Sequence, residues 1–152
     1  MVAQLLAAVG LDLSARAYPV EGGLRDMRQI RLLARLRVHV HASIGWQPES
    51  PVGGPTDLRA WDVELVIPNC RIGVDAEARV RDFQAVDRRV MLKQRDSGVD
   101  RVILVLPDTR SNRDMLRSLP PAASANYPVP ARAVLAALRR GTDPGGNAVL
   151  VP

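Results

Sequence analysis

The sequence predicts an α/β domain with a central mixed β-sheet flanked by helices. Two strand-like runs lie on either side of a turn within residues 57–80, and residues 83–95 have the spacing of an amphipathic helix. Residues 99–106 form an almost unbroken apolar run, which is typical of a strand buried on both faces. A hairpin, a helix and a buried strand in that order favour a sandwich of α and β layers.

We expect residues 1–24 to form an N-terminal extension and residues 25–152 to form a single core domain. The extension is predicted to contain a short helix at 2–9 and a strand at 11–17. The core then begins with a long amphipathic helix. Its apolar stripe consists of Met27, Ile30, Leu33, Leu36 and Val40. His39 and His41 at its end are two residues apart and share no helix face, so we expect them in a loop rather than at a metal.

Part of residues 43–55 is expected to form a strand that leads into the hairpin. In the second hairpin strand, apolar residues at even positions from 72 to 80 alternate with polar ones. Asp75, Glu77 and Arg79 therefore share one face, on which we expect Asp75 to be a solvated residue. Trp61, in the first strand, is predicted to pack in the core on the face of Val63.

The register of the hairpin depends on its turn, which Pro68, Asn69 and Cys70 mark. If Asn69 and Cys70 are the central turn residues, Asp62 lies opposite Glu77. Two facing carboxylates repel each other, so a cation is expected between them. The sequence leaves two choices open, a metal ion or the guanidinium of Arg79 nearby.

The second half of the chain is predicted to alternate helices and strands. The helix at 82–96 buries a stripe formed by Phe83, Val86 and Val90, and Gly98 ends it. After the buried strand, Ser111 is expected to cap a helix that runs to Leu119. A third helix runs from Pro130 to Gly141, and residues 148–151 form a last short strand.

The composition favours a polyanionic partner. The net charge is +5, and Lys93 is the only lysine among 21 basic residues. Such a balance favours nucleic acid over membrane, although arginine also serves as a general surface cation. The single cysteine, Cys70, excludes an internal disulfide and fits a reducing cytoplasm. No apolar run reaches the roughly 18 residues of a membrane span, and the first residues lack the basic start of a signal peptide, so we expect a cytoplasmic protein.

Glu49, Asp62 and the triplet Glu77-Ala78-Arg79 form a spaced series of acids that ends in an acid-x-cation pair. Here the sequence resembles the PD-(D/E)xK, or restriction-endonuclease-like, nuclease superfamily, over roughly residues 25–106. In that family, an acid on one strand and an acid-x-Lys on its hairpin neighbour bind a divalent metal, with a helix packed behind them. The resemblance therefore implies a restriction-endonuclease-like fold and a metal-dependent DNA endonuclease.

The resemblance also assigns roles to individual residues. Asp62, Glu77 and Arg79 would be catalytic, with Arg79 at the position of the family lysine. Asp62, Glu77 and Glu49 would bind Mg²⁺ or Mn²⁺, which prefer carboxylate oxygens. The helix after the hairpin would contact nucleic acid through Gln84, Arg88, Lys93, Gln94 and Arg95. Arginine stays protonated and cannot act as a base, so Arg79 departs from the family pattern.

This departure keeps a second function open, a catalytically inactive nuclease-fold module that binds DNA or regulates transcription. In that case Asp62, Glu77 and Arg79 would form a salt-bridge cluster. Residues 57–113 also resemble the C-terminal part of actinobacterial proteins that begin with a repressor-type helix-turn-helix. That module has no room before Leu11, so we expect it to be missing from this chain. A role in toxin–antitoxin or phage-defence systems fits either activity, and a homodimer is left open.

Overall fold

The computed structural model describes residues 20–152, and it contains one five-stranded mixed sheet in the order β1-β2-β3-β4-β5. The strands are β1 (Gly45–Pro51), β2 (Ala60–Ile67), β3 (Cys70–Ala76), β4 (Arg101–Val105) and β5 (Ala148–Leu150). The first three are antiparallel, whereas β3, β4 and β5 run parallel. The prediction of a central mixed sheet flanked by helices is confirmed. The helix expected at 2–9 and the strand expected at 11–17 lie outside the described residues.

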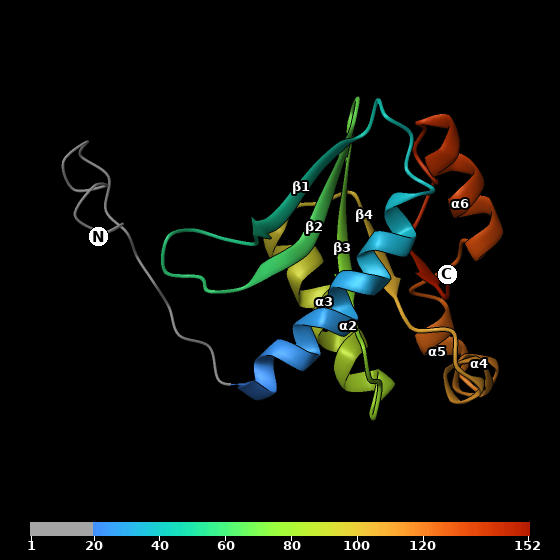
Figure 1. Ribbon diagram of the computed structural model, residues 1–152. Helices are drawn as coiled ribbons and strands as arrows, with labels where there is room; N and C mark the ends of the chain where they lie inside the picture. Colours follow the sequence, from blue (N-terminus) through green and yellow to red (C-terminus); the bar gives the residue numbers. More distant parts are fainter. Residues whose placement is uncertain (1–19) are drawn as a thin grey trace, which may run out of the picture.

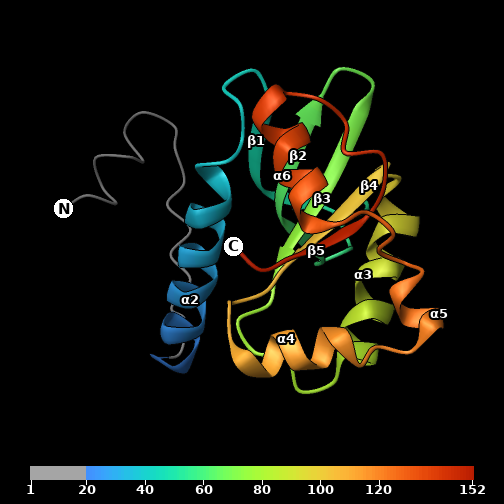
Figure 2. The same ribbon diagram turned by 90° about the vertical axis from the view of Figure 1, so that its right-hand side faces the viewer.

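Helices cover both faces of this sheet (Figures 1 and 2). One core lies between the sheet and two helices, α2 (Val20–Arg37) and α6 (Ala131–Arg140). The other lies between the sheet and α3 (Phe83–Ser97), α4 (Arg110–Arg117) and α5 (Pro121–Ser124). The sheet is thus the middle layer of a three-layer sandwich.

The connection from β3 to β4 explains why the second half of the sheet is parallel. A hairpin cannot join parallel strands, so the chain crosses over the sheet as α3. The Asp82 carboxylate caps the start of α3 by accepting from Ala85 N, and Gly98 ends it with a left-handed φ of 66°. Within β4, residues 102–105 are buried, as the apolar run predicted.

Several predicted helix details differ from the structure. Helix α2 buries Leu32 and Leu36, whereas Met27 and Ile30 of the predicted stripe are about half exposed. The face of α2 that packs against the core is therefore rotated about the helix axis relative to the predicted face. Thr109, rather than Ser111, caps α4, because its side chain accepts from Asn112 N. The helix opened by Pro130 and closed by Gly141 is confirmed.

The histidines lie in the loop after α2, as predicted. The Nδ1 atom of His39 is 2.8 Å from an Arg139 guanidinium nitrogen, and that of His41 is 2.8 Å from Ser43 Oγ. Among residues 20–152, no helix combines the length and apolar character that crossing a membrane requires.

Candidate functional site

The hairpin turn sets the position of the acids, and it differs from the predicted turn. Ile67 pairs with Cys70, so the turn residues are Pro68 and Asn69, and Asn69 takes a left-handed φ of 62°. Asparagine tolerates this conformation after proline in a tight turn. The predicted register is therefore wrong by two residues: continued one step beyond the last pair, Val63–Val74, the observed register would put Asp62 opposite Asp75 and not Glu77.

The sheet opens between β2 and β3 directly after the Val63–Val74 pair. Both backbone groups of Ala76 are then bound by side chains instead of strand neighbours. Its N–H donates to Asp62 Oδ2 at 2.7 Å, and its carbonyl accepts from Gln29 Nε2 of α2 at 2.8 Å. Two side chains from different elements therefore hold the peptide groups on either side of Ala76, the residue after Asp75.

The alternation of β2 also breaks at Asp62. Trp61 packs with α3 in one core, whereas Val63 packs in the core on the opposite face, although the two are only two residues apart. Across from this break, Glu49 in β1 has a positive φ of 52°. The prediction that Trp61 is a core residue is confirmed, but its predicted face is wrong. A local irregularity of this kind re-aims side chains at the end of a strand.

Lys93 extends from α3 into the space that this break creates. Its Nζ donates to both carboxylate oxygens of Asp75 at 2.8 Å and to the Ala60 carbonyl at 2.6 Å. It also lies 5.1 Å from the ring centroid of Trp61, in a cation–π arrangement. The Lys93 side chain is only 10% exposed and that of Asp75 only 6%, so this is a buried ion pair. Asp75 is not the solvated residue that we expected.

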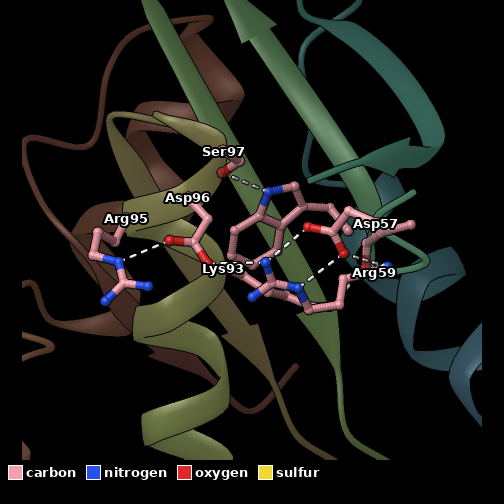
Figure 3. Close-up of polar contacts among 8 residues, drawn as sticks. Asp57, Arg59, Lys93, Arg95, Asp96 and Ser97 are labelled. Carbon is pink, nitrogen blue, oxygen red and sulfur yellow. Dashed lines mark hydrogen bonds and ion pairs between the residues drawn. The ribbon is translucent and has the colours of Figure 1, made fainter. Parts of the chain in front are cut away.

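A surface network lies over this pair (Figure 3). Arg59 bonds Asp57 at 2.7 Å and Asp96 of α3 at 2.9 Å, and it thereby ties the end of the β1–β2 loop to the last turn of α3. Its hydrogen bonds lower the pKa of Asp57 to about 2. In the same view, Ser97 Oγ accepts from the indole of Trp61 at 3.1 Å.

Asp62 completes the group of charged side chains that we name the Asp62–Asp75–Lys93 cluster. Burial raises the pKa of Asp62, and the negative charges of Asp75 and Glu77 act in the same direction. The hydrogen bond from Ala76 and the charge of Lys93 oppose this rise. Asp62 is thus an acid held next to a second carboxylate in a partly buried position, which is where a cation would be most stabilising.

The other predicted catalytic residues lie outside this cluster. Strand β3 ends at Ala76, so Glu77 and Arg79 belong to the loop before α3 and do not continue the strand face. Glu77 forms an ion pair with Arg89 of α3 at 2.6 Å. Arg79 and Glu49 are exposed. We predicted that Asp62 and Glu77 face each other across the hairpin with Arg79 nearby. This prediction is wrong, because it depended on a hairpin register that differs by two residues from the observed one.

The predicted nucleic-acid contacts on α3 divide into two groups. Gln84, Arg88 and Arg95 are exposed, and Arg95 pairs with Asp96 at 2.7 Å. Gln94 exchanges hydrogen bonds with Asn147 at 3.0 and 3.3 Å. Lys93 differs from all of these, because it points inward and is the buried partner of Asp75. It does not share the exposed face of α3.

Sequence reasoning missed Gln29 and Asp75 as members of the site. The signal for Lys93 was present, since the buried positions 83, 86 and 90 continue to 93 at helical spacing. Among the side chains of residues 27–152, no group of three or more His, Cys, Asp or Glu is arranged to hold a metal ion. A cation here would have two carboxylates, which is the number that Mg²⁺ commonly takes when water and phosphate complete its shell.

Comparisons of the chain with protein-family models, with curated proteins and with solved structures found no significant match.

Proposed function

We propose that this chain is a metal-dependent nucleic-acid phosphodiester hydrolase with a restriction-endonuclease-like fold, and that the Asp62–Asp75–Lys93 cluster is its site. One observation carries the proposal: the only lysine of a chain with 21 basic residues is buried against a carboxylate, beside a second carboxylate. Elsewhere this chain uses arginine for positive charge. An amine is chemically different, because it can lose its proton, whereas a guanidinium cannot.

Asp62 and Asp75 would hold Mg²⁺ or Mn²⁺ between β2 and β3. The ion would supply positive charge and Lewis acidity to a phosphate group. Asp62 uses Oδ2 to accept from Ala76, and among the side chains of residues 27–152 none donates a hydrogen bond to its Oδ1. That oxygen is therefore the one that Asp62 offers to a cation.

Lys93 neutralises Asp75 in the resting arrangement. If Asp75 bound such a cation, Lys93 Nζ would be free to donate to a phosphate oxygen, where its positive charge would stabilise the negative charge that develops during hydrolysis. Lys93 would thus do the work that the sequence assigned to Arg79. The exposed Gln84 and Arg88 on α3 would contact the nucleic-acid backbone, with DNA as the expected substrate.

Cleavage of labelled DNA and RNA in Mn²⁺ tests this proposal with three variants. Asp62→Asn should abolish both Mn²⁺ binding and cleavage. Lys93→Arg keeps the charge but should lower the cleavage rate at least tenfold, while Mn²⁺ affinity changes little. Arg79→Ala is the matched control and should cleave like the parent protein. Loss of cleavage in Arg79→Ala, with full activity in Lys93→Arg, would assign the catalytic cation to Arg79 instead.

A second candidate is a catalytically inactive nuclease-fold module that binds nucleic acid. It is favoured by the complete pairing of Lys93, whose three donors are all used by Asp75 and Ala60. Such a cluster would be a structural ion pair without a metal. A parent protein that binds DNA but neither binds Mn²⁺ nor cleaves would establish this second function and refute the first.

A further inference from the structure

Gln29 is the polar member of the inward face of α2. It lies three and seven residues before Leu32 and Leu36, which are both buried in the core beneath the sheet. Gln29 itself is half-buried, and a polar group withdrawn from water in this way needs a hydrogen-bond partner. The partner of Gln29 is the carbonyl of Ala76, at 2.8 Å and 47 residues away in the sequence.

The carbonyl that Gln29 binds belongs to the same residue whose N–H binds Asp62. Where β2 and β3 separate, Ala76 has lost the neighbour that would otherwise pair with both of these groups. Gln29 therefore anchors one end of a short chain of contacts that runs from α2 through Ala76 to the Asp62 carboxylate. Asp75, the residue before Ala76, is held by the same backbone.

We infer that Gln29 is a positioning residue, which sets the geometry of the Asp62–Asp75 pair by fixing the backbone of Ala76. The inference rests on the proposed function insofar as the pair binds a metal. Groups that orient ligands in this way typically change metal affinity by about 10- to 100-fold when they are removed. Gln29 touches neither a carboxylate of the pair nor Lys93 through any hydrogen bond within residues 20–152, so its effect passes through Ala76.

The test compares Gln29→Met with Asn112→Ala. Gln29→Met keeps the length of the side chain and removes the donor. Asn112 is the matched control, because its buried amide also donates to a backbone carbonyl, that of Pro107 at 2.9 Å, but it lies in α4 and forms no hydrogen bond with Ala76 or with the cluster. Both changes leave a carbonyl without its donor, so both should lower the melting temperature.

Two further measurements separate positioning from structural support. In Gln29→Met the Mn²⁺ dissociation constant should rise about tenfold, and the pKa of Asp62, followed by carboxyl ¹³C NMR without metal, should rise as the Ala76 bond weakens. Asn112→Ala should change neither quantity. If Gln29→Met does not fold, Gln29→Leu replaces it, since leucine already occupies this face at 32 and 36.

The outcomes distinguish this inference from the proposed function. An unchanged pKa of Asp62 in the Gln29 variant would overturn the positioning role, whether or not metal binds. A shifted pKa in a protein whose parent form binds no Mn²⁺ would support the positioning role and refute the hydrolase instead. Equal effects of the Gln29 and Asn112 substitutions on the Asp62 pKa would also overturn it, because they would report a general loosening of the fold.

Discussion

The buried ion pair between Lys93 and Asp75 makes a quantitative prediction about stability. We consider Lys93→Met, which keeps an unbranched apolar side chain of similar length in the same place. The change removes the positive charge and leaves the Asp75 carboxylate buried, with only 6% of its side chain exposed. It also removes the donor to the Ala60 carbonyl, which Lys93 now binds at 2.6 Å.

Removing one partner of a buried pair typically costs about 3–5 kcal/mol, because the remaining charge has lost its compensation. The lost bond to the Ala60 carbonyl is expected to add about 1 kcal/mol, unless water takes its place. A single domain of this size loses about 2–4 °C in melting temperature per kcal/mol. We therefore expect Lys93→Met to lower the melting temperature by roughly 10–20 °C.

Thermal denaturation followed by circular dichroism, with and without the second change Asp75→Leu, measures this effect. The double variant removes both charges and should recover much of the lost stability, since apolar residues often replace a buried pair without cost. A loss below about 1 kcal/mol in Lys93→Met would be typical of a solvated pair and would refute the reasoning. No recovery in the double variant would show that packing, and not charge, caused the loss.

Three further predictions concern single side chains. Burial raises the pKa of Asp62 above its ordinary value of 3.8, so the folded state binds the proton more tightly than the unfolded state, and stability should fall as the pH rises through the raised pKa. Urea denaturation without metal should show this pH-dependent loss in the parent protein but not in Asp62→Asn. At neutral pH the free energy of unfolding of Asp62→Asn should equal or exceed that of the parent protein. A lower value would indicate that Asp62 forms a stabilising salt bridge in the parent protein. Among residues 27–152, the buried hydroxyl of Tyr127 meets no acceptor in hydrogen-bond geometry, although burial and the nearby Asp87 carboxylate raise the pKa of Tyr127. Tyr127→Phe should therefore leave the free energy of unfolding unchanged or higher, and a loss above about 1 kcal/mol would instead indicate a hydrogen bond from this hydroxyl to Asp87. Arg88→Glu should weaken DNA binding about equally across sequences and reduce the slope of log affinity against log salt by about 1. The control Arg110→Glu on α4 should change neither quantity. Equal slopes in the two variants would show that Arg88 does not contact DNA.

Much of the fold could be predicted because its signals are local. The 99–106 run, the Pro130–Gly141 helix and the stripe of Phe83, Val86 and Val90 each depend on spacing and on helix ends, which the sequence carries directly. The inward face of α2 could not be predicted in the same way. Both of its faces carry apolar residues, so only the packing against the sheet decides that Leu32 is buried and Met27 is not.

Asp62 could be found as an acid of the site, but Asp75, the acid beside it, could not. The register of a hairpin depends on where the turn closes, and Pro68, Asn69 and Cys70 allow more than one choice. A shift of two residues keeps every side chain on its predicted face, so the alternation pattern could not reveal the error. The same shift nevertheless changes which residue the register puts opposite Asp62, from Glu77 to Asp75. Arg79 lies beyond the end of the strand.

Lys93 could have been recognised from the sequence by two facts taken together. It continues the buried stripe of α3, and it is the only lysine of a chain that otherwise uses arginine. A basic residue in a buried stripe requires an acid on the facing strand, because an uncompensated charge there would cost several kcal/mol. Asp75 is the acidic residue of β3, so this requirement would have offered it as the partner of Lys93, with Asp62 and Glu64 of β2 as the other acids that it allows. The same requirement makes the cluster testable without any assumption about function, because Lys93→Met leaves the buried Asp75 carboxylate without its ion-pair partner.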